Sequence, residues 1–167
     1  MNKTSNIARG GLFTALGVLF IYLSVISPTS KLYLLGVASC IVPVSILSTT
    51  LKNGFYTYLA TSLLSLLLIG FKGNVLAYII FFGLYGFVKY YIETLRKMPA
   101  EIALKLLFFN AAITVLYFLS KVFFNDLLSI NISIYAAIFM LQFVFLIYDY
   151  ALTLFIVYIQ KYFKKIS

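Results

Sequence analysis

The stretch I-Y-A-A-I-F-M-L-Q-F-V-F-L-I-Y-D-Y-A-L-T-L-F-I-V-Y-I, from Ile134 to Ile159, decides the fold class of this chain. It is almost wholly apolar, and Asp149 is its one charged residue. A helix of about 20 apolar residues is long enough to cross the hydrocarbon core of a bilayer. The stretch therefore predicts a transmembrane helix.

Five more apolar runs precede it, and short polar turns separate them. The S-P-T-S sequence at Ser27–Ser30 ends the first run, and an Asn53-Gly54 turn ends the second, which carries Pro43 inside it. Pro99 and Glu101 suit the first turn of the fifth helix. We therefore predict one all-α domain over residues 1–167, a polytopic integral membrane protein with six transmembrane helices. These helices are expected at 11–26, 32–51, 55–71, 75–92, 102–124 and 134–159.

The composition excludes several classes of protein. Hydrophobic residues make up 63% of the chain and charged residues 10%, far from the balance of a soluble domain. Histidine is absent and Cys40 is the single cysteine, so the commonest metal ligands and the usual general base are missing. We therefore expect no cofactor and no metal site, and an intramembrane enzyme is the class that the composition favours least.

The net charge of +9 suits a nucleic-acid binder, but the lysines stand at the ends of apolar runs. In a membrane protein this placement predicts topology, because basic residues gather in cytoplasmic loops. With six spans, ten basic residues fall on the side of the two termini and three on the other side. The ten are Lys3, Arg9, Lys52, Lys89, Arg96, Lys97, Lys105, Lys161, Lys164 and Lys165; the three are Lys31, Lys72 and Lys121. We therefore expect both termini in the cytoplasm of a multi-pass cell-membrane protein that contacts lipids and no nucleic acid.

Small residues form two adjacent stripes on the first helix. Ala8, Gly11 and Ala15 share one face, while Gly10 and Thr14 lie on the next, together with Gly17. Small residues at this spacing let another helix approach closely, which drives association where hydrophobicity cannot. Two interpretations stay open here: packing within this chain, or a docking face for another membrane protein.

At the first and third helices the chain resembles a known family, the substrate-binding S-components of energy-coupling-factor (ECF) transporters. The resemblance rests on size, on six spans with both ends inside, and on two short stretches. One is Gly11-x-x-x-Ala15, similar to the A-x-x-x-A pattern of that family's first helix. The other is L-K-N-G-F-Y-T-Y-L-A-T-S-L-L-S, from Leu51 to Ser65, which resembles the basic-glycine turn before its third helix.

The resemblance implies a division of labour between subunits. The small-residue face of the first helix, at Ala8, Gly10, Gly11, Thr14 and Ala15, would dock on a transmembrane coupling subunit. Cytoplasmic ATPases would power the transport of a small molecule that this chain captures. The chain itself carries no G-x-x-x-x-G-K-[ST] phosphate loop, which agrees with that division.

A substrate that arrives from outside would meet the outward loops and the outer halves of the helices. Gln142 is the most suggestive residue there, since an amide two turns inside a span needs a partner. An interhelical hydrogen bond would satisfy it equally well. The polar residues expected to line the site are Lys31, Lys72, Asn74, Tyr78, Lys121, Asn131, Tyr135 and Gln142.

Charged residues also fall on the cytoplasmic half. Tyr85, Lys89 and Glu93 follow one helix face at steps of four residues, a spacing that predicts a Lys–Glu pair. Asp149 lies deep enough in the sixth span that its charge is costly. Contact with a coupling partner or with anionic lipid is a second interpretation of the segment around Lys89 and Glu93. For Asp149 the interpretations are a role in coupling, a buried pair with Lys89 or Lys105, and protonation.

A non-catalytic membrane scaffold is the main alternative, for example one like the rod-shape protein MreD of the cell-wall machinery. A stand-alone ion-coupled transporter is disfavoured, because the chain shows neither repeats nor paired midplane charges. The two main hypotheses make different predictions for the outer half. A substrate binder gathers polar groups around an outward cavity, whereas a scaffold fills that space with Leu, Phe and Ile.

Overall fold

Helices account for all the regular secondary structure in the computed structural model, which describes residues 3–95, 97–124 and 134–166. The prediction of an all-α fold is therefore confirmed for this part of the chain. The elements, in order, are α1 (Lys3–Ile26), α2 (Lys31–Ser48), α3 (Leu51–Ile69), α4 (Gly73–Ala77), the π-helical turn η1 (Tyr78–Phe82), α5 (Gly83–Glu93), α6 (Met98–Phe124) and α7 (Ile134–Ile166).

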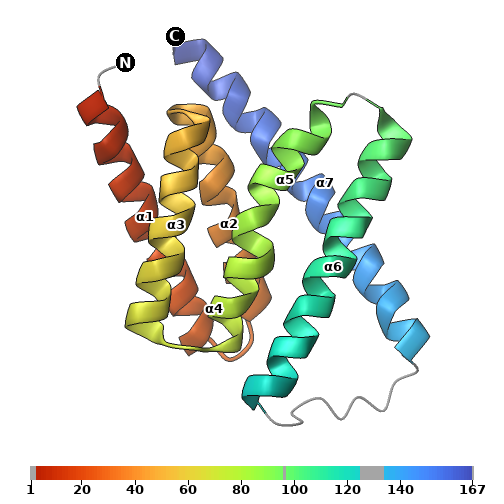
Figure 1. Ribbon diagram of the computed structural model, residues 1–167. Coiled ribbons are helices and arrows are strands. Elements are labelled where there is room, and N and C mark those ends of the chain that lie inside the picture. The colour runs from red at the N-terminus through yellow and green to blue at the C-terminus, as the bar shows by residue number, and fades with distance from the viewer. Residues whose placement is uncertain (1–2, 96, 125–133, 167) are drawn as a thin grey trace.

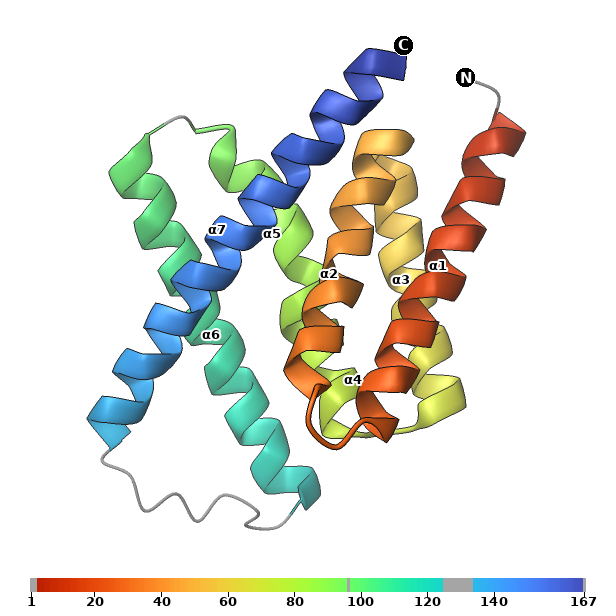
Figure 2. The ribbon, with the colours of Figure 1, turned by 180° about the vertical axis from the view of Figure 1, so that it is seen from behind.

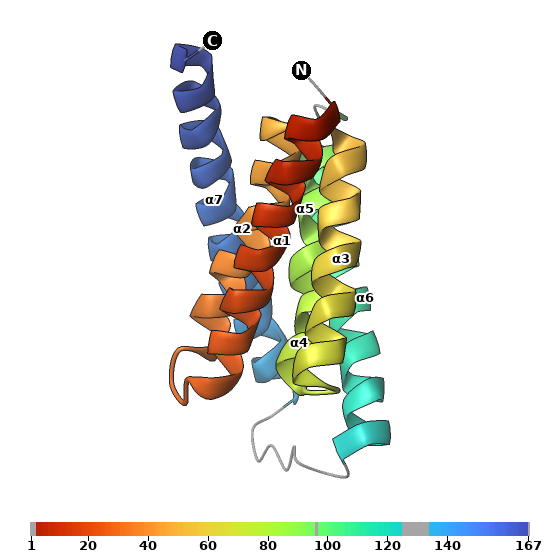
Figure 3. The ribbon, with the colours of Figure 1, turned by 90° about the vertical axis from the view of Figure 1, so that its left-hand side faces the viewer.

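The helices run up and down between two ends of one bundle (Figure 1). The start of α1 and the end of α7 lie at the same end, which we call the terminus end; the α5–α6 connection lies there too. The α1–α2 and α3–α4 connections lie at the far end. Helix α7 crosses the bundle obliquely, as the view from behind shows (Figure 2). Seen from the side, α7 and α3 lie at opposite edges of the bundle (Figure 3).

Five helical segments among the described residues are long and apolar enough to cross a membrane. They are Thr4–Ile26, Lys31–Ser48, Gly73–Glu93, Met98–Lys121 and Phe139–Tyr162. These segments fall in five of the six predicted spans. The remaining predicted span, 55–71, coincides with α3, which has 19 residues but is less apolar.

The polar residues of α3 face the inside of the bundle. Thr57, Thr61 and Ser65 are buried, whereas Leu63 and Leu67 on the opposite face are 60% and 81% exposed. Small and hydroxyl-bearing side chains let helices approach closely and bond across the interface where no hydrophobic force draws them together. The hydroxyl-bearing residues that lower the mean hydropathy of α3 therefore lie on its packing face, while leucines dominate the outward face of its second half.

The predicted turn at Asn53-Gly54 is wrong, because both residues belong to the first turn of α3. The chain breaks earlier, at Thr49 and Thr50, and the Thr50 hydroxyl accepts a hydrogen bond from the Asn53 backbone N–H at 3.3 Å. That bond is the normal cap of a helix N-terminus. Gly54 is buried instead against Ile46, where an added Cβ would collide with the isoleucine side chain. Gly54 therefore allows α3 to pack closely against α2, and the Asn-Gly pattern does not mark a turn here.

Other helices begin or end a few residues from their predicted bounds. Helix α1 starts at Lys3 rather than at residue 11, and α7 continues to Ile166 rather than to residue 159. Helix α6 begins at Met98, so that Pro99 and Glu101 do occupy its first turn. The far end of α3 is closed by Gly70, whose φ of 83° is the left-handed conformation that glycine adopts without strain.

A π-helical turn interrupts the fourth apolar run without breaking it. Such a turn leaves a carbonyl without its usual partner inside the helix. Here the Tyr58 hydroxyl of α3 donates a 2.9 Å hydrogen bond to the carbonyl of Ile79. Gly83 follows the turn, and an added Cβ there would stand 2.7 Å from the Tyr58 ring. The turn and the glycine together bring α3 and α5 into contact through one tyrosine.

An aromatic cluster joins η1, α6 and α7. Phe109 and Phe145 stack with ring centroids 4.4 Å apart, and Phe81 meets both of them edge to face. Offset and edge-to-face ring pairs are each worth about 0.5–1.5 kcal/mol beyond the area that they bury. Tyr148 extends the cluster to α2 through a 2.6 Å hydrogen bond with Ser39. The cluster also contacts the charged residues described next, because Phe81 stacks on Tyr85 and the Tyr85 hydroxyl donates to Asp149.

Candidate functional site

Four charged side chains from three helices form a closed ring in the half of the bundle nearer the terminus end. Lys89 and Glu93 come from α5, Lys105 from α6 and Asp149 from α7. Each lysine contacts both carboxylates: Lys89 with Glu93 (2.8 Å) and Asp149, and Lys105 with Glu93 (3.0 Å) and Asp149 (2.9 Å). The ring therefore alternates in charge and has no net charge.

The ammonium group of Lys89 has its hydrogen-bonding capacity filled. Its side chain is 1% exposed. Besides the two carboxylates, Nζ lies 2.7 Å from the Thr153 hydroxyl and 3.3 Å from the Asp149 carbonyl oxygen. Because an ammonium group has three protons to donate, these four acceptors leave none over for a further ligand.

Asp149 is the most connected acceptor of the ring. Its Oδ1 accepts from Lys89 and from the Tyr85 hydroxyl, the latter at 2.6 Å, and its Oδ2 accepts from Lys105 at 2.9 Å. A lone aspartate or lysine at the centre of a membrane helix costs about 2.5–3.5 kcal/mol. Because each charge in the ring is paired with opposite charges, most of that free-energy cost is offset. Charged side chains can therefore be buried among apolar ones.

The predicted pairing of these residues is confirmed. The Lys89–Glu93 pair follows from the spacing of four residues within one helix, as expected. For Asp149 the alternatives were a pair with Lys89 or Lys105, protonation, or a role in coupling, and the structure brings both lysines to it. Tyr85 lies on the predicted face with Lys89 and joins the ring as a donor. Thr153 was not foreseen, although its position four residues after Asp149 places it on the same face of α7.

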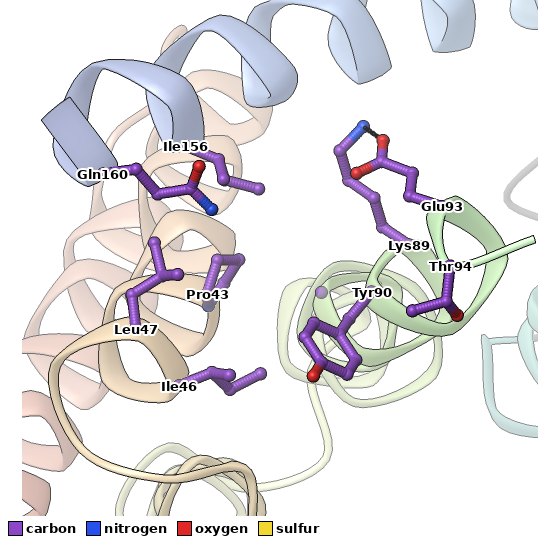
Figure 4. Close-up of a pocket in the computed structure, with 10 residues that line it drawn as sticks. Pro43, Ile46, Leu47, Lys89, Tyr90, Glu93, Thr94, Ile156 and Gln160 are labelled. Carbon is purple, nitrogen blue, oxygen red and sulfur yellow. Dashed lines mark ion pairs between the residues drawn. The ribbon is translucent and has the colours of Figure 1, made fainter. Parts of the chain in front are cut away.

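A groove of about 490 Å³ opens beside the ring, between α2, α5 and α7 (Figure 4). One wall is apolar and is built from Pro43, Ile46, Leu47 and Ile156. The opposite wall is polar and aromatic. It is built from Gly86, Lys89, Tyr90, Glu93 and Thr94, and Gln160 closes the side contributed by α7.

Gly86 shapes the floor of this groove. An added Cβ at Gly86 would lie 3.0 Å from Pro43 Cδ, so α2 and α5 touch through a glycine and a proline ring. The proline sits inside α2, as predicted. Beyond this contact the two helices leave the space that becomes the groove. The groove could not be predicted from the sequence, because its walls come from three segments that are far apart in the chain: 43–47, 86–94 and 156–160.

The residues expected around an outward substrate site do not converge in the described part of the chain. Tyr78 is 0% exposed, and its hydroxyl finds no partner among the described residues. Asn74 donates to the carbonyl and the hydroxyl of Ser24, at 2.7 and 3.2 Å, and so ties α4 to α1. Lys31, the first residue of α2, and Lys72, in the α3–α4 connection, are both exposed at the far end.

The remaining expected site residues come from α6 and α7. Lys121 is exposed and lies over the ring of Tyr117, 4.9 Å from its centroid. Gln142 is half-buried in α7. Asn131 and the side chain of Tyr135 lie outside the described residues. A ligand site that includes these last positions stays a prediction.

The two small-residue stripes of α1 have different surroundings. Gly10 and Thr14, predicted as part of a docking face, are buried against α3, so for these two residues the prediction is corrected. Added Cβ atoms at Gly10 and Gly17 would meet Asn53 and Thr61 of α3, at 3.2 and 2.8 Å. The other stripe, Ala8, Gly11 and Ala15, is exposed, and nothing lies within 4 Å of a Cβ added at Gly11.

Comparisons with known proteins found no relative of this chain. No family model matches the chain, and neither a curated protein nor a solved structure does.

Proposed function

We propose that the protein is a six-span, non-catalytic subunit of a membrane complex, with both termini in the cytoplasm. The sixth span in this proposal is α3, whose outward face is apolar. An even number of spans agrees with the two ends of the chain lying at one end of the bundle (Figure 1). The excess of basic residues at that end supports a cytoplasmic assignment.

One observation carries the proposal that the subunit docks on another membrane protein. Of two neighbouring small-residue stripes on α1, one is used for packing against α3 and the other is left on the surface. A glycine in the middle of a helix costs about 0.5–1 kcal/mol relative to alanine. Nothing in the described part of the chain lies within 4 Å of a Cβ added at Gly11, so close packing inside the described bundle does not explain the glycine. A partner helix that packs closely on Ala8, Gly11 and Ala15 supplies the reason for these residues.

The first role that fits is the one implied by the resemblance to S-components of energy-coupling-factor transporters. The exposed stripe then binds a transmembrane coupling subunit that works with cytoplasmic ATPases. The protein captures a micronutrient, and the partners supply the energy. Its support is the position of the free stripe, which is where the resemblance requires a docking face.

The second role is that of a scaffold without a substrate, similar to MreD. Its support comes from three apolar side chains buried in the far half of the bundle, although buried hydroxyl groups such as those of Ser65 and Tyr78 also lie there. Ile21, Leu35 and Val75 are each at most 1% exposed there, and Asn74 is engaged by Ser24. This is the filling that we expect of a scaffold.

Docking is tested by pairing two substitutions on the same helix. Gly11→Leu changes the exposed stripe and Gly17→Leu changes the buried one. We expect Gly11→Leu to leave the protein folded in mild detergent and to abolish recovery of its membrane partner by affinity purification. Gly17→Leu should instead prevent folding, because its side chain would meet Thr61. Recovery of the partner with Gly11→Leu at the wild-type level would refute docking through this stripe.

The two roles are separated by native mass spectrometry of the purified complex. An S-component should arrive with a coupling subunit and a bound small molecule. A scaffold should arrive with cell-wall proteins and no small molecule. A matched control, Leu23→Phe, changes the size of another exposed side chain of α1 and should leave both outcomes unchanged.

A further inference from the structure

We propose that the groove between α2, α5 and α7 is a binding site for a small organic cation with an apolar body. The site lies at the terminus end of the bundle, beside the charge ring, and away from the α1 stripe. It goes beyond the docking role and does not depend on it. The ligand class follows from which hydrogen-bonding groups of the groove remain open.

The lysine of the groove is closed to ligands. Lys89 lines the groove, but its ammonium is surrounded by Glu93, Asp149 and Thr153. Lys105, the other lysine of the ring, is buried and does not line the groove. An anionic ligand would therefore have to displace a carboxylate from a closed ring, at the cost of leaving that carboxylate unpaired in an apolar surrounding.

Glu93, the acidic residue that lines the groove, has one carboxylate oxygen available to a ligand. Both lysines contact Oε1 of Glu93, and Oε2 takes no hydrogen bond from the described part of the chain. The side chain is 36% exposed and lines the groove beside Lys89 (Figure 4). A carboxylate oxygen at the edge of an apolar cavity is an acceptor for a charged N–H donor, and such charge-assisted bonds are about twice as strong as neutral ones.

Two further groups fit a cation. The ring of Tyr90 lies in the same wall as Glu93, one turn of α5 before Thr94, and aromatic faces attract ammonium groups. The amide of Gln160 reaches into the groove from α7, across from Glu93 (Figure 4). An amide offers both a donor and an acceptor, so it can bind a polar substituent of the ligand.

The apolar wall defines the rest of the ligand. Pro43, Ile46, Leu47 and Ile156 face the space with carbon atoms alone. A volume of about 490 Å³ lies within the range of small-molecule sites, roughly 300–1,000 Å³. The geometry therefore suits one ammonium group at Glu93 and a hydrocarbon or aromatic body against α2 and α7.

The test uses three probes of one shape that differ in charge: 4-phenylbutylammonium, 4-phenylbutanol and 4-phenylbutyrate. Binding is measured by equilibrium dialysis against the protein in lipid nanodiscs, and partition into empty nanodiscs is subtracted. We expect saturable binding of the ammonium probe and much weaker binding of the other two. Equal binding of the alcohol, or tighter binding of the carboxylate, overturns the proposal.

Two variants locate the site. Glu93→Gln should weaken ammonium binding by roughly tenfold or more, the usual effect of losing a hydrogen bond to a charged group. Because this variant also opens the ring, Leu47→Trp provides a second test, as it fills the groove and leaves the ring intact. Leu63→Trp, on the exposed face of α3, is its matched control.

The variants show whether the ammonium probe binds in the groove. Loss of binding in Leu47→Trp with normal binding in Leu63→Trp supports the site, and normal binding in both refutes it. A phospholipid found by native mass spectrometry in the wild type and lost in Leu47→Trp would show that the groove holds lipid instead. Gly11→Leu should bind the ammonium probe like the wild type, so failure of the docking proposal and failure of this one are distinguishable.

Discussion

Lys105 of α6 and Asp149 of α7 form an ion pair of 2.9 Å although 44 residues of chain separate them. The pair is one side of the ring that also includes Lys89 and Glu93 of α5. Large apolar side chains of α6 and α7 are exposed along most of their length. Lipid tails are as apolar as those side chains, so burial alone gives the two helices little reason to meet. The ring, together with the stacked pair Phe109–Phe145, provides specific contacts between them.

Removing one member of the ring should destabilise the fold strongly. Asp149→Leu leaves two lysines with a single carboxylate, and breaking a buried pair in this way costs about 3–5 kcal/mol. We expect a loss of that order in the free energy of unfolding, measured by denaturant titration in detergent. The double variant Lys105→Met with Asp149→Leu keeps the Lys89–Glu93 pair and should recover more than half of the loss. Simple addition of the two single effects would contradict coupling through the ring.

Two glycines should respond in opposite ways to alanine. Gly83→Ala puts a methyl group 2.7 Å from the Tyr58 ring, and overpacking of this kind costs about 1–3 kcal/mol. Gly11→Ala meets nothing and lowers the entropy of the unfolded chain, so it should stabilise by about 0.5–1 kcal/mol. Thermal unfolding of the purified variants measures both. Equal effects would mean that α3 and α5 are not in the close contact described here.

The Tyr58 hydroxyl should stabilise the fold, because it donates a hydrogen bond to a carbonyl of the π-helical turn. Tyr58→Phe removes the donor to the Ile79 carbonyl and leaves that acceptor buried, at a cost of about 1–3 kcal/mol. Hydrogen exchange of the 78–82 segment should quicken in the same variant. Tyr56→Phe is the matched control, since Tyr56 is 65% exposed. An unchanged exchange rate in Tyr58→Phe would show that the turn does not depend on this bond.

Asn74 should contribute to stability through its bonds to Ser24. Hydrogen bonds between membrane helices are worth about 0.6 kcal/mol on average and at most about 1.7 kcal/mol. Asn74→Ala should therefore lower the unfolding free energy by about 1 kcal/mol, and Ser24→Ala combined with it should add little. Asn110→Ala, at an exposed position of α6, is the control. Full additivity of the two variants would argue against a direct bond.

The proposed topology predicts opposite labelling at the two ends of the bundle. In a Cys40→Ser background, Lys52→Cys lies at the terminus end and Lys72→Cys at the far end, and both positions are exposed. A membrane-impermeant thiol reagent applied to intact cells should label Lys72→Cys only. Labelling of Lys52→Cys under these conditions would reverse the orientation, and labelling of both would contradict an odd number of spans between them.

The charge ring was partly predictable and the groove was not. Spacing by four residues within one helix determines that Lys89 and Glu93 meet, and the cost of a lone charge predicts that Asp149 finds a lysine. That both lysines share both carboxylates depends on how α5, α6 and α7 cross. The Asn53-Gly54 turn was wrong, and of the two interpretations left open for Gly10 and Thr14 the structure shows packing within the chain. Glycine serves turns and close packing alike, and only its neighbours in space distinguish the two uses.

The sequence by itself determined that this is a helical protein of the membrane, because apolar runs of sufficient length have no other stable form in a bilayer. It also determined approximately where the helices lie and named Lys89 and Lys105 as candidate partners of Asp149. The tertiary structure alone decided which stripe of α1 is exposed, which oxygen of Glu93 contacts the lysines, and that a groove opens between α2, α5 and α7. Those features depend on contacts between segments far apart in the chain. Among helices surrounded by lipid, such contacts follow from shape and hydrogen bonding, and hydrophobic periodicity carries little information about them.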